Sequence, residues 1–476
     1  MKKIMRKLGG VVLFFVLSGI SVGGSAQITT FQKIYSSPVA QSSRDVLPTP
    51  DGGYFIAGMT EKTPGDSDIY LVKTNGAGDT LWTKTYGGIG PDYPHTLLQL
   101  PDGNYFVMGF TKSFGAGQGD IWLIKVDPSG NYIWDKTYGG AGDDEGHEII
   151  PTNDGNYMIG GRINNQAALL KIDPSGNTMW TKTYGGPLYE SGASVKQALD
   201  GGYILLATTF SYGPGRGDSW LLKTNATGDT LWTKIFGGPN FDEAKYVLAN
   251  PDGSYTFCMC DSSSGAGDFD VQVIKVTGSG AVVWNKTYGG TKKDVCKMIQ
   301  HTLDGGYIVT AISRSFGWIN PDFWLVKLDA AGDTMWTRHY GSWDHEHNYA
   351  VKQLADGSYI AIGHTRSYSN HTEIMFLKLD LQGTMTSANE LVMDDHALNV
   401  YPNPTGGMVK IDLDAMQGFT SMRVCNALGQ EIYAEKFDGP LQVMSRTIDL
   451  QGKEPGIYFA IFRSGQGLVT KKIILE

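Results

Sequence analysis

The stretch Asp102-Gly-Asn-Tyr105 decides the fold, because the pattern Asp-Gly-x-Tyr occurs seven times along the chain. The other copies are Asp51-Gly-Gly-Tyr54, Asp154-Gly-Asn-Tyr157, Asp200-Gly-Gly-Tyr203, Asp252-Gly-Ser-Tyr255, Asp304-Gly-Gly-Tyr307 and Asp356-Gly-Ser-Tyr359. Successive copies lie 46 to 52 residues apart. A period of this length indicates stacked supersecondary units, none of which can bury its apolar face alone.

Each unit predicts four β-strands. In the second unit, runs rich in β-branched and aromatic residues cover 105–109, 121–126 and 132–138, and a short strand such as 148–150 in the next unit precedes the Asp-Gly turn. The runs at 105–109 and 121–126 are apolar almost throughout, as in strands covered on both faces. In the run at 132–138 polar and apolar residues alternate, as in an outer strand with one face in water. Four such strands, flanked by similar units, form a β-propeller blade.

The number of blades follows from counting repeated residues. The third strands carry seven lysines, from Lys73 to Lys378, but the fourth strands carry only six tryptophans, from Trp82 to Trp336. The missing fourth strand is supplied by Phe31-Gln-Lys-Ile-Tyr35, which aligns with the Trp-Thr-Lys-Thr-Tyr strands. We therefore predict an all-β chain with a seven-bladed β-propeller over residues 27–386, whose N-terminal strand closes the last blade.

The N-terminal residues 1–26 have the pattern of a secretory signal peptide. It has a basic start, an apolar run over 11–17 and the small residues Gly24-Ser-Ala26 before Gln27. No later run reaches the roughly 20 apolar residues of a membrane-spanning helix.

Four of the positive residues lie in the leader, so the formal charge of −9 becomes about −13 in the mature chain. This charge argues against nucleic acid or an anionic membrane as a partner.

The four cysteines predict isolated, buried thiols. They are too few for a disulfide scaffold, and no Cys-x-x-Cys pair suggests a metal site. Cys258 and Cys260 alternate on one strand, Cys296 lies one repeat later and Cys425 lies in the C-terminal part.

After a linker at 387–397, residues 398–476 have a different composition. Five short apolar runs with Gly and Pro turns predict a small β-sandwich of about six or seven strands. Four motifs stand out: Tyr401-Pro-Asn-Pro-Thr405, Asn426-Ala-Leu-Gly429, Pro455-Gly-Ile-Tyr458 and the terminal Lys471-Lys-Ile-Ile-Leu475. These motifs closely resemble the type A C-terminal sorting domain of type IX secretion.

The resemblance implies that the protein is carried by the type IX secretion machinery. After signal-peptide cleavage and periplasmic transit, the chain would cross the outer membrane and be released or attached at the cell surface. The sorting motif then comprises Tyr401, Pro402, Asn403, Pro404, Gly456, Tyr458, Lys471 and Lys472. Sorting domains are carried by cargoes of many kinds, so the resemblance implies no activity for residues 27–386.

The loops between strands two and three, and the crossings between units, lie on one face of the predicted disc and vary in sequence. Variable loops on a rigid scaffold are the usual place for binding. Two acidic series recur there. The first follows the Gly-Gly stop and precedes the inner strands: Asp92, Asp144, Glu190, Asp242, Asp294 and Glu346, with Gln41 at the seventh, equivalent position. The second opens the third strands: Asp68, Asp120, Asp218, Asp270, Asp322 and Glu373, with Gln166 in the short unit.

The first series predicts carboxylates around the mouth of the central channel, where they could hold a cation such as calcium or a polycationic ligand. The alternative is that these side chains cap turns by accepting backbone N–H groups. Aromatic residues in the variable loops, Phe114, Tyr212, Phe316 and Trp318, could stack on sugar rings or fill space beneath the loops. The run Asp344-His-Glu-His347 has metal-ligand residue types but is more typical of a solvated loop.

These features predict a secreted or cell-surface binding protein, monomeric, with an extracellular glycan or protein ligand at the variable-loop face. No nucleophile and base stand out, arginines are scattered, and the chain departs from its repeat in few places, whereas catalytic sites break symmetry. The alternative is a propeller-type hydrolase that acts on extracellular glycans or peptides.

Overall fold

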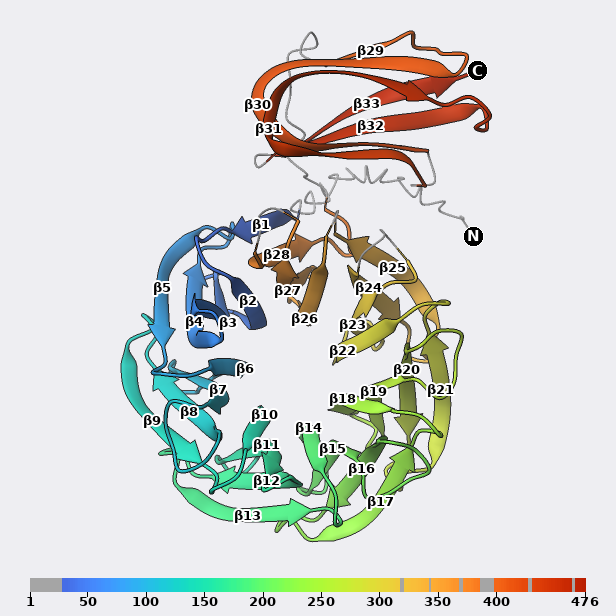
Figure 1. The fold of residues 1–476 in the computed structure, drawn as a ribbon. Coiled ribbons are helices and arrows are strands. Elements are labelled where there is room, and N and C mark those ends of the chain that lie inside the picture. Colours follow the sequence, from blue (N-terminus) through green and yellow to red (C-terminus); the bar gives the residue numbers. More distant parts are fainter. Residues whose placement is uncertain are drawn as a thin grey trace, which may run out of the picture.

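The computed structural model describes residues 28–316, 321–341, 344–367, 371–385, 398–426, 430–464 and 467–476. The expected signal peptide, the linker at 387–397 and Trp318 lie outside these residues. The described part of the repeat region forms seven four-stranded antiparallel sheets arranged in a ring (Figure 1). None of the described segments is a helix long and apolar enough to cross a membrane.

Each sheet is a blade, numbered here from one to seven, in which the chain runs from the inside of the ring outwards (Figure 1). The innermost strands are β2 (Gln41–Pro48), β6 (Asp92–Gln99), β10 (Glu145–Pro151), β14 (Glu190–Gln197), β18 (Glu243–Ala249), β22 (Asp294–His301) and β26 (Glu346–Gln353). The second strands are β3 (Tyr54–Thr63), β7 (Tyr105–Thr111), β11 (Tyr157–Ile163), β15 (Tyr203–Thr209), β19 (Tyr255–Asp261), β23 (Tyr307–Ser313) and β27 (Tyr359–Thr365).

The two outer positions complete each blade. The third strands are β4 (Asp66–Thr74), β8 (Asp120–Val126), β12 (Gln166–Ile172), β16 (Asp218–Thr224), β20 (Asp270–Val276), β24 (Asp322–Leu328) and β28 (Glu373–Leu379). The outermost strands are β5 (Thr80–Tyr86), β9 (Tyr132–Tyr138), β13 (Thr178–Tyr184), β17 (Thr230–Phe236), β21 (Val282–Tyr288) and β25 (Thr334–Tyr340), and blade seven takes β1 (Phe31–Tyr35).

The N-terminal strand closes the ring as the sequence predicts. β1 pairs antiparallel with β28, with Phe31 opposite Lys378 and Tyr35 opposite Ile374. The Phe31 ring is buried and lies 5.2 Å from the ring of Phe376 in blade seven and 6.2 Å from that of Tyr54 in blade one. One side chain therefore contacts both ends of the repeat region.

Neighbouring blades are joined by a latch that recurs around the ring. The outer-strand aromatic of one blade lies over the turn glycine of the next, so a Cβ atom on Gly130 would lie 2.4 Å from the Trp82 ring. In the same way Trp134, Trp180, Trp232, Trp284 and Trp336 cover Gly176, Gly228, Gly280, Gly332 and Gly383, and Phe31 covers Gly78. At six of these seven junctions the tyrosine at the end of the outer strand also donates its hydroxyl to the carbonyl of that glycine, as Tyr138 does to Gly176 at 2.7 Å.

The repeated lysine and the repeated Asp-Gly turn have a common explanation. The third-strand lysine of a blade forms an ion pair with the aspartate of its own turn, at 2.8 Å for Lys73 and Asp51 and 2.7 Å for Lys125 and Asp102. The equivalent pairs in blades three to six are Lys171–Asp154, Lys223–Asp200, Lys275–Asp252 and Lys327–Asp304. The ammonium group thus fixes the turn that starts the second strand.

The C-terminal strands form one connected sheet: β29 (Leu398–Tyr401), β30 (Met408–Asn426), β31 (Glu431–Asp449), β32 (Gly456–Ser464) and β33 (Gly467–Leu475). Among the described residues, the prediction of six or seven strands is corrected to five. Two of the five predicted apolar runs, one at 409–413 and one beginning at residue 422, lie in the two halves of β30, which stays paired with β31 through several register shifts. Both halves contribute to one core, Val409 and Ile411 from the first and Met422 and Val424 from the second.

The four cysteines are free and buried, as predicted. Cys258, Cys260 and Cys296 lie in one apolar cluster between blades five and six. They therefore act as core residues.

The latch predicts a sharp difference between two glycines of blade two. Gly130 has φ +71° and lies beneath Trp82, whereas Gly103 has φ +83° and no atom within 4 Å of the position that a Cβ would occupy. Gly103→Ala should cost only the left-handed backbone strain, about 1–2 kcal/mol. Gly130→Ala should cost about 1–3 kcal/mol more, because the added methyl group displaces the Trp82 ring.

Denaturant unfolding of the full chain measures both free energies. Equal losses for Gly130→Ala and Gly103→Ala would show that the Trp82 contact does not hold the blades together.

Candidate functional site

The first acidic series is buried beneath the loops and does not line an open channel mouth. Asp92, Asp144, Glu190, Asp242, Asp294 and Glu346 are all 0% exposed. Asp294, for example, accepts hydrogen bonds from the Gly290 N–H at 2.8 Å and from the Ser313 hydroxyl at 2.6 Å. This arrangement favours the turn-capping interpretation, and calcium binding by the series stays a prediction.

The second acidic series meets the first at the crossings between blades. A Cβ atom on Gly237 would lie 2.3 Å from Asp218 Oδ1 and 2.8 Å from Asp242 Oδ2, which explains why the outer strand must stop at glycine. Asp218 Oδ1 is buried with no hydrogen-bond partner among the described residues. Burial raises the pKa of Asp218, and the charge of Asp242 raises it further.

Blade three replaces this carboxyl pair by an amide and a carboxylate. Gln166 Nε2 donates to Glu190 Oε2 at 3.0 Å, in the place where blade four has Asp218 and Asp242. An amide can supply the hydrogen bond that two ionised carboxylates lack. The crossing therefore tolerates a neutral donor at the third-strand position.

We predict that Asp218→Asn stabilises the folded protein at pH 7 by about 1 kcal/mol, the worth of one added hydrogen bond. Because the pKa of Asp218 is raised in the folded state, the wild-type protein gains stability as pH falls through that pKa. The advantage of the variant should therefore shrink towards acidic pH.

The matched variant is Gln166→Glu, which creates a carboxyl pair in blade three and should lower stability at pH 7. Thermal or denaturant unfolding between pH 4 and 8 measures both variants. Destabilisation by Asp218→Asn at pH 7 would contradict this account.

The predicted aromatic loop residues lie away from the channel. Phe114, Tyr212 and Phe316 are 39–43% exposed, and their rings lie 5.0–5.5 Å from those of the buried Trp122, Trp220 and Trp324. None of the three lines the central cavity described below. Each ring has one face on its blade and one towards solvent, so glycan stacking by these residues stays a prediction.

The central channel is the strongest candidate for a functional site among the described residues. It contains a cavity of about 730 Å³ lined by the innermost strands. Every innermost strand has a register shift at the same place, for example between Gly146 and Glu148 in β10. Such a β-bulge turns an extra side chain out of the ladder. The seven bulged residues all line the cavity: Arg44, His95, His147, Ala193, Lys245, Lys297 and Tyr349.

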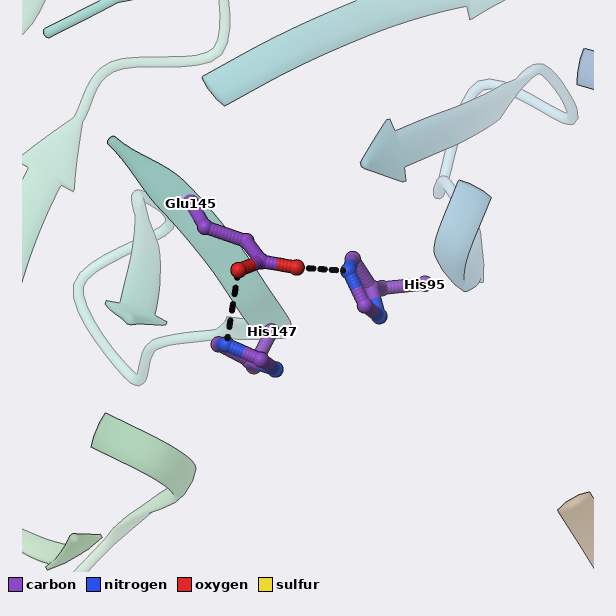
Figure 2. A group of neighbouring side chains, drawn as sticks. All are labelled: His95, Glu145 and His147. Atoms are coloured by element: carbon purple, nitrogen blue, oxygen red, sulfur yellow. Dashed lines mark hydrogen bonds and ion pairs between the residues drawn. The ribbon is translucent and has the colours of Figure 1, made fainter. Parts of the chain in front are cut away.

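On one side of the channel, two histidines converge on a glutamate (Figure 2). His95 Nε2 lies 2.9 Å from Glu145 Oε1, and His147 Nε2 lies 3.7 Å from Glu145 Oε2. The buried Arg162 on β11 bonds Glu145 at 3.1 Å and Asp143 at 3.0 Å. Burial lowers the pKa of His147 to about 4, so its imidazole is neutral at pH 7. This is the single group of three or more potential metal ligands among the described residues.

Elsewhere around the channel, on blades one, six and seven, two cations flank one aromatic ring. The Arg44 guanidinium lies 4.3 Å from the centre of the Tyr349 ring, and the Lys297 ammonium lies 5.5 Å from it. Neither cation forms an ion pair with a carboxylate of the described residues. Burial, together with the charge of Lys245, lowers the pKa of Lys297 to about 8.

The other charges along the channel are paired. Lys352 bonds Asp45 at 3.1 Å, Lys245 bonds Glu243 at 2.5 Å, and Lys196 bonds Glu148. Arg44 and Lys297 therefore stand out as the cations of the cavity that lack an anion among the described residues.

The Asp344-His-Glu-His347 run does not assemble a site. His345 Nδ1 bonds Asp344 Oδ1 at 2.6 Å, whereas the His347 ring lies 4.9 Å from that of His364 on β27. Glu346 is buried beneath its loop. The run Asp344–His347 therefore has the residue types of a metal motif, but within the described residues each side chain has a separate structural role.

The C-terminal motifs lie close together in the sheet. Asn403 donates to the Lys472 carbonyl at 2.7 Å and accepts from the Ile474 N–H at 2.8 Å, so the Tyr401–Thr405 opening is tied to β33. Tyr458, in the strand that Gly456 begins, is buried and donates to the Glu454 carbonyl at 2.7 Å. Lys471 and Lys472 lie on β33 opposite Ala460 and Phe459.

Several solved structures resemble the chain at low identity. The structure of PorZ, a surface component of the type IX secretion system of Porphyromonas gingivalis, has 12% identity and a TM-score of 0.30. The match covers 90% of this chain and 69% of that one. The Pan2 WD40 domain of Neurospora crassa has 11% identity and a TM-score of 0.46, and the match covers 74% of this chain and 96% of that domain. The β-propeller domain of the Trilobed protease from Pyrococcus furiosus has 10% identity and a TM-score of 0.41, and the match covers 75% of this chain and 98% of that domain. The comparison with curated proteins gave no match.

The family comparison concerns the C-terminal residues. Residues 399–476 match the secretion system C-terminal sorting domain, in agreement with the motifs at Tyr401–Pro404, Gly456–Tyr458 and Lys471–Lys472. The chain is therefore a β-propeller cargo with a type IX C-terminal sorting domain, which directs it to the cell surface or the medium.

Proposed function

We propose that the protein is a secreted or cell-surface binding protein whose central channel takes an anionic extracellular ligand, in the first instance an acidic glycan. The observation that supports this is the pair Arg44 and Lys297, which flank Tyr349 without a carboxylate partner among the described residues. Arg44 and Lys297 are half-buried, and a partly desolvated cation without a counterion is unfavourable, so an anionic ligand would stabilise both.

The ligand class follows from the chemistry of this side of the channel. A guanidinium binds carboxylate or sulfate groups with two parallel hydrogen bonds, and an ammonium adds a point charge. Tyr349 offers an aromatic face on which a sugar ring can stack at small entropic cost. A cavity of about 730 Å³ is in the usual size range of small-ligand sites. The proposal thus places the ligand in the channel and not on the aromatic loops.

The test is a glycan array that includes uronic-acid, sulfated and neutral members, followed by titration calorimetry with the best binder. Lys297→Met should weaken binding about 10- to 100-fold, since a hydrogen bond to a charged group is worth about 1.5–3 kcal/mol. Lys234→Met, an exposed lysine on the outer strand β17, serves as the control and should have no effect.

Equal binding of neutral and acidic glycans would overturn this proposal, as would full affinity in Lys297→Met. Binding of an acidic protein segment in place of any glycan would replace the ligand class.

A second candidate function, hydrolysis of extracellular glycans or peptides, is favoured by the convergence of His95, Glu145 and His147 on the cavity. Imidazole and carboxylate groups are the usual general acids and bases. A broad glycosidase and peptidase screen should then find a substrate whose turnover Glu145→Gln abolishes. Absence of turnover across the screen, or unchanged turnover in Glu145→Gln, would count against an enzyme.

A further inference from the structure

We propose that His95, Glu145 and His147 bind a divalent transition-metal ion, zinc in the first instance, on the channel wall between blades two and three. Two imidazoles and one carboxylate form the ligand set of zinc sites that keep the fourth position open for water or a ligand. The three residues come from neighbouring innermost strands, β6 and β10. This proposal does not depend on the binding of an anionic glycan.

The separations of the ligand atoms suit a tetrahedral ion. With bonds of about 2.1 Å, the ligand atoms of a tetrahedral zinc site lie about 3.4 Å apart. His95 Nε2 lies 2.9 Å from Glu145 Oε1, and His147 Nε2 lies 3.7 Å from the other carboxylate oxygen, Oε2, so the two distances lie on either side of this value. One atom from each of the three residues lies within 4.8 Å of the others. Small side-chain rotations are enough to close the site.

The histidine nitrogens are available for a metal ion. His147 Nε2 is buried and has no hydrogen-bond partner among the described residues. In Figure 2 both imidazole rings point their nitrogens at the Glu145 carboxylate, which is the direction a shared ion would occupy. A buried polar atom without a partner is unfavourable, so the ion would satisfy a group that the protein alone does not.

The backbone and the second layer hold the ligands in place. His95 and His147 are the bulged residues of their strands, which places both side chains in the cavity. The Arg162 guanidinium fixes Glu145 through Oε2 and is itself held by Asp143. Glu145 Oε1 accepts a hydrogen bond from the Tyr93 hydroxyl at 3.3 Å and faces His95 Nε2 at 2.9 Å, and an ion would take the place of the His95 contact. Hydrogen bonds of this kind orient metal-binding carboxylates. The cavity beside the group leaves the fourth position open.

The experiment uses the full chain without a polyhistidine tag, stripped of metal and titrated with zinc alone by calorimetry and equilibrium dialysis. One zinc ion should bind per chain, and calcium, which prefers oxygen ligands, should not compete. His147→Ala and Glu145→Gln should weaken binding by at least about 100-fold, more than the loss of an outer-layer contact. His345→Ala is the matched control, because His345 lies in a histidine–carboxylate run that does not assemble a site.

Cobalt(II) gives a readout that requires no variant. One equivalent should produce the visible absorption of a four-coordinate ion, and zinc should abolish it. No cobalt spectrum and no zinc binding in the wild-type protein would overturn the proposal, as would full affinity in a folded His147→Ala variant. Lys297→Met should bind zinc normally, so failure of the metal site and failure of the glycan proposal give different results.

Discussion

The rest of the structure depends on the contact between the outer-strand aromatic ring of one blade and the turn glycine of the next. At all seven junctions of the described ring an aromatic ring lies where the glycine Cβ would stand. Only glycine suits this position, for two reasons. Its φ of +68° to +83° forms the turn, and the absence of a Cβ leaves room for the aromatic ring. Phe31 makes this contact to Gly78 across the ends of the repeat region, so the closing junction resembles the others.

Because the latches and blade cores stabilise the ring, the channel-facing positions are free to vary. The buried third-strand lysines, turn aspartates and crossing carboxylates repeat from blade to blade with few changes. The seven bulged residues do not: they include two histidines, three cations, an alanine and a tyrosine. A departure from symmetry in the channel-facing positions of the innermost strands is expected where a symmetric scaffold carries a single site.

Most of the fold could be predicted because its signals are local and repeated. The Asp-Gly-x-Tyr turns, the alternating outer strands and the surplus strand at Phe31–Tyr35 specify the ring before any packing is known. The site could not be predicted in this way. His95 and Glu145 are 50 residues apart, and the inner strand of blade three was expected only from residue 148, whereas β10 begins at Glu145. A bulge depends on strand pairing, which the residue pattern of one strand does not reveal. Alignment of the seven inner strands, position by position, is the signal that would have exposed Arg44, His147 and Lys297.

The acidic residues show why recurrence alone misleads. A carboxylate that recurs at each crossing performs a task common to all crossings, and capping its loop is such a task. A ligand site in the channel needs different groups at different positions, and the bulged positions supply imidazoles, a guanidinium and an ammonium, while the regularly paired Glu145 adds a carboxylate. With imidazoles and a carboxylate on blades two and three and cations on blades one and six, an asymmetric anionic ligand would have one preferred orientation in the cavity. Specificity in this protein is therefore expected to reside in the innermost strands, and the loops above them supply the rim.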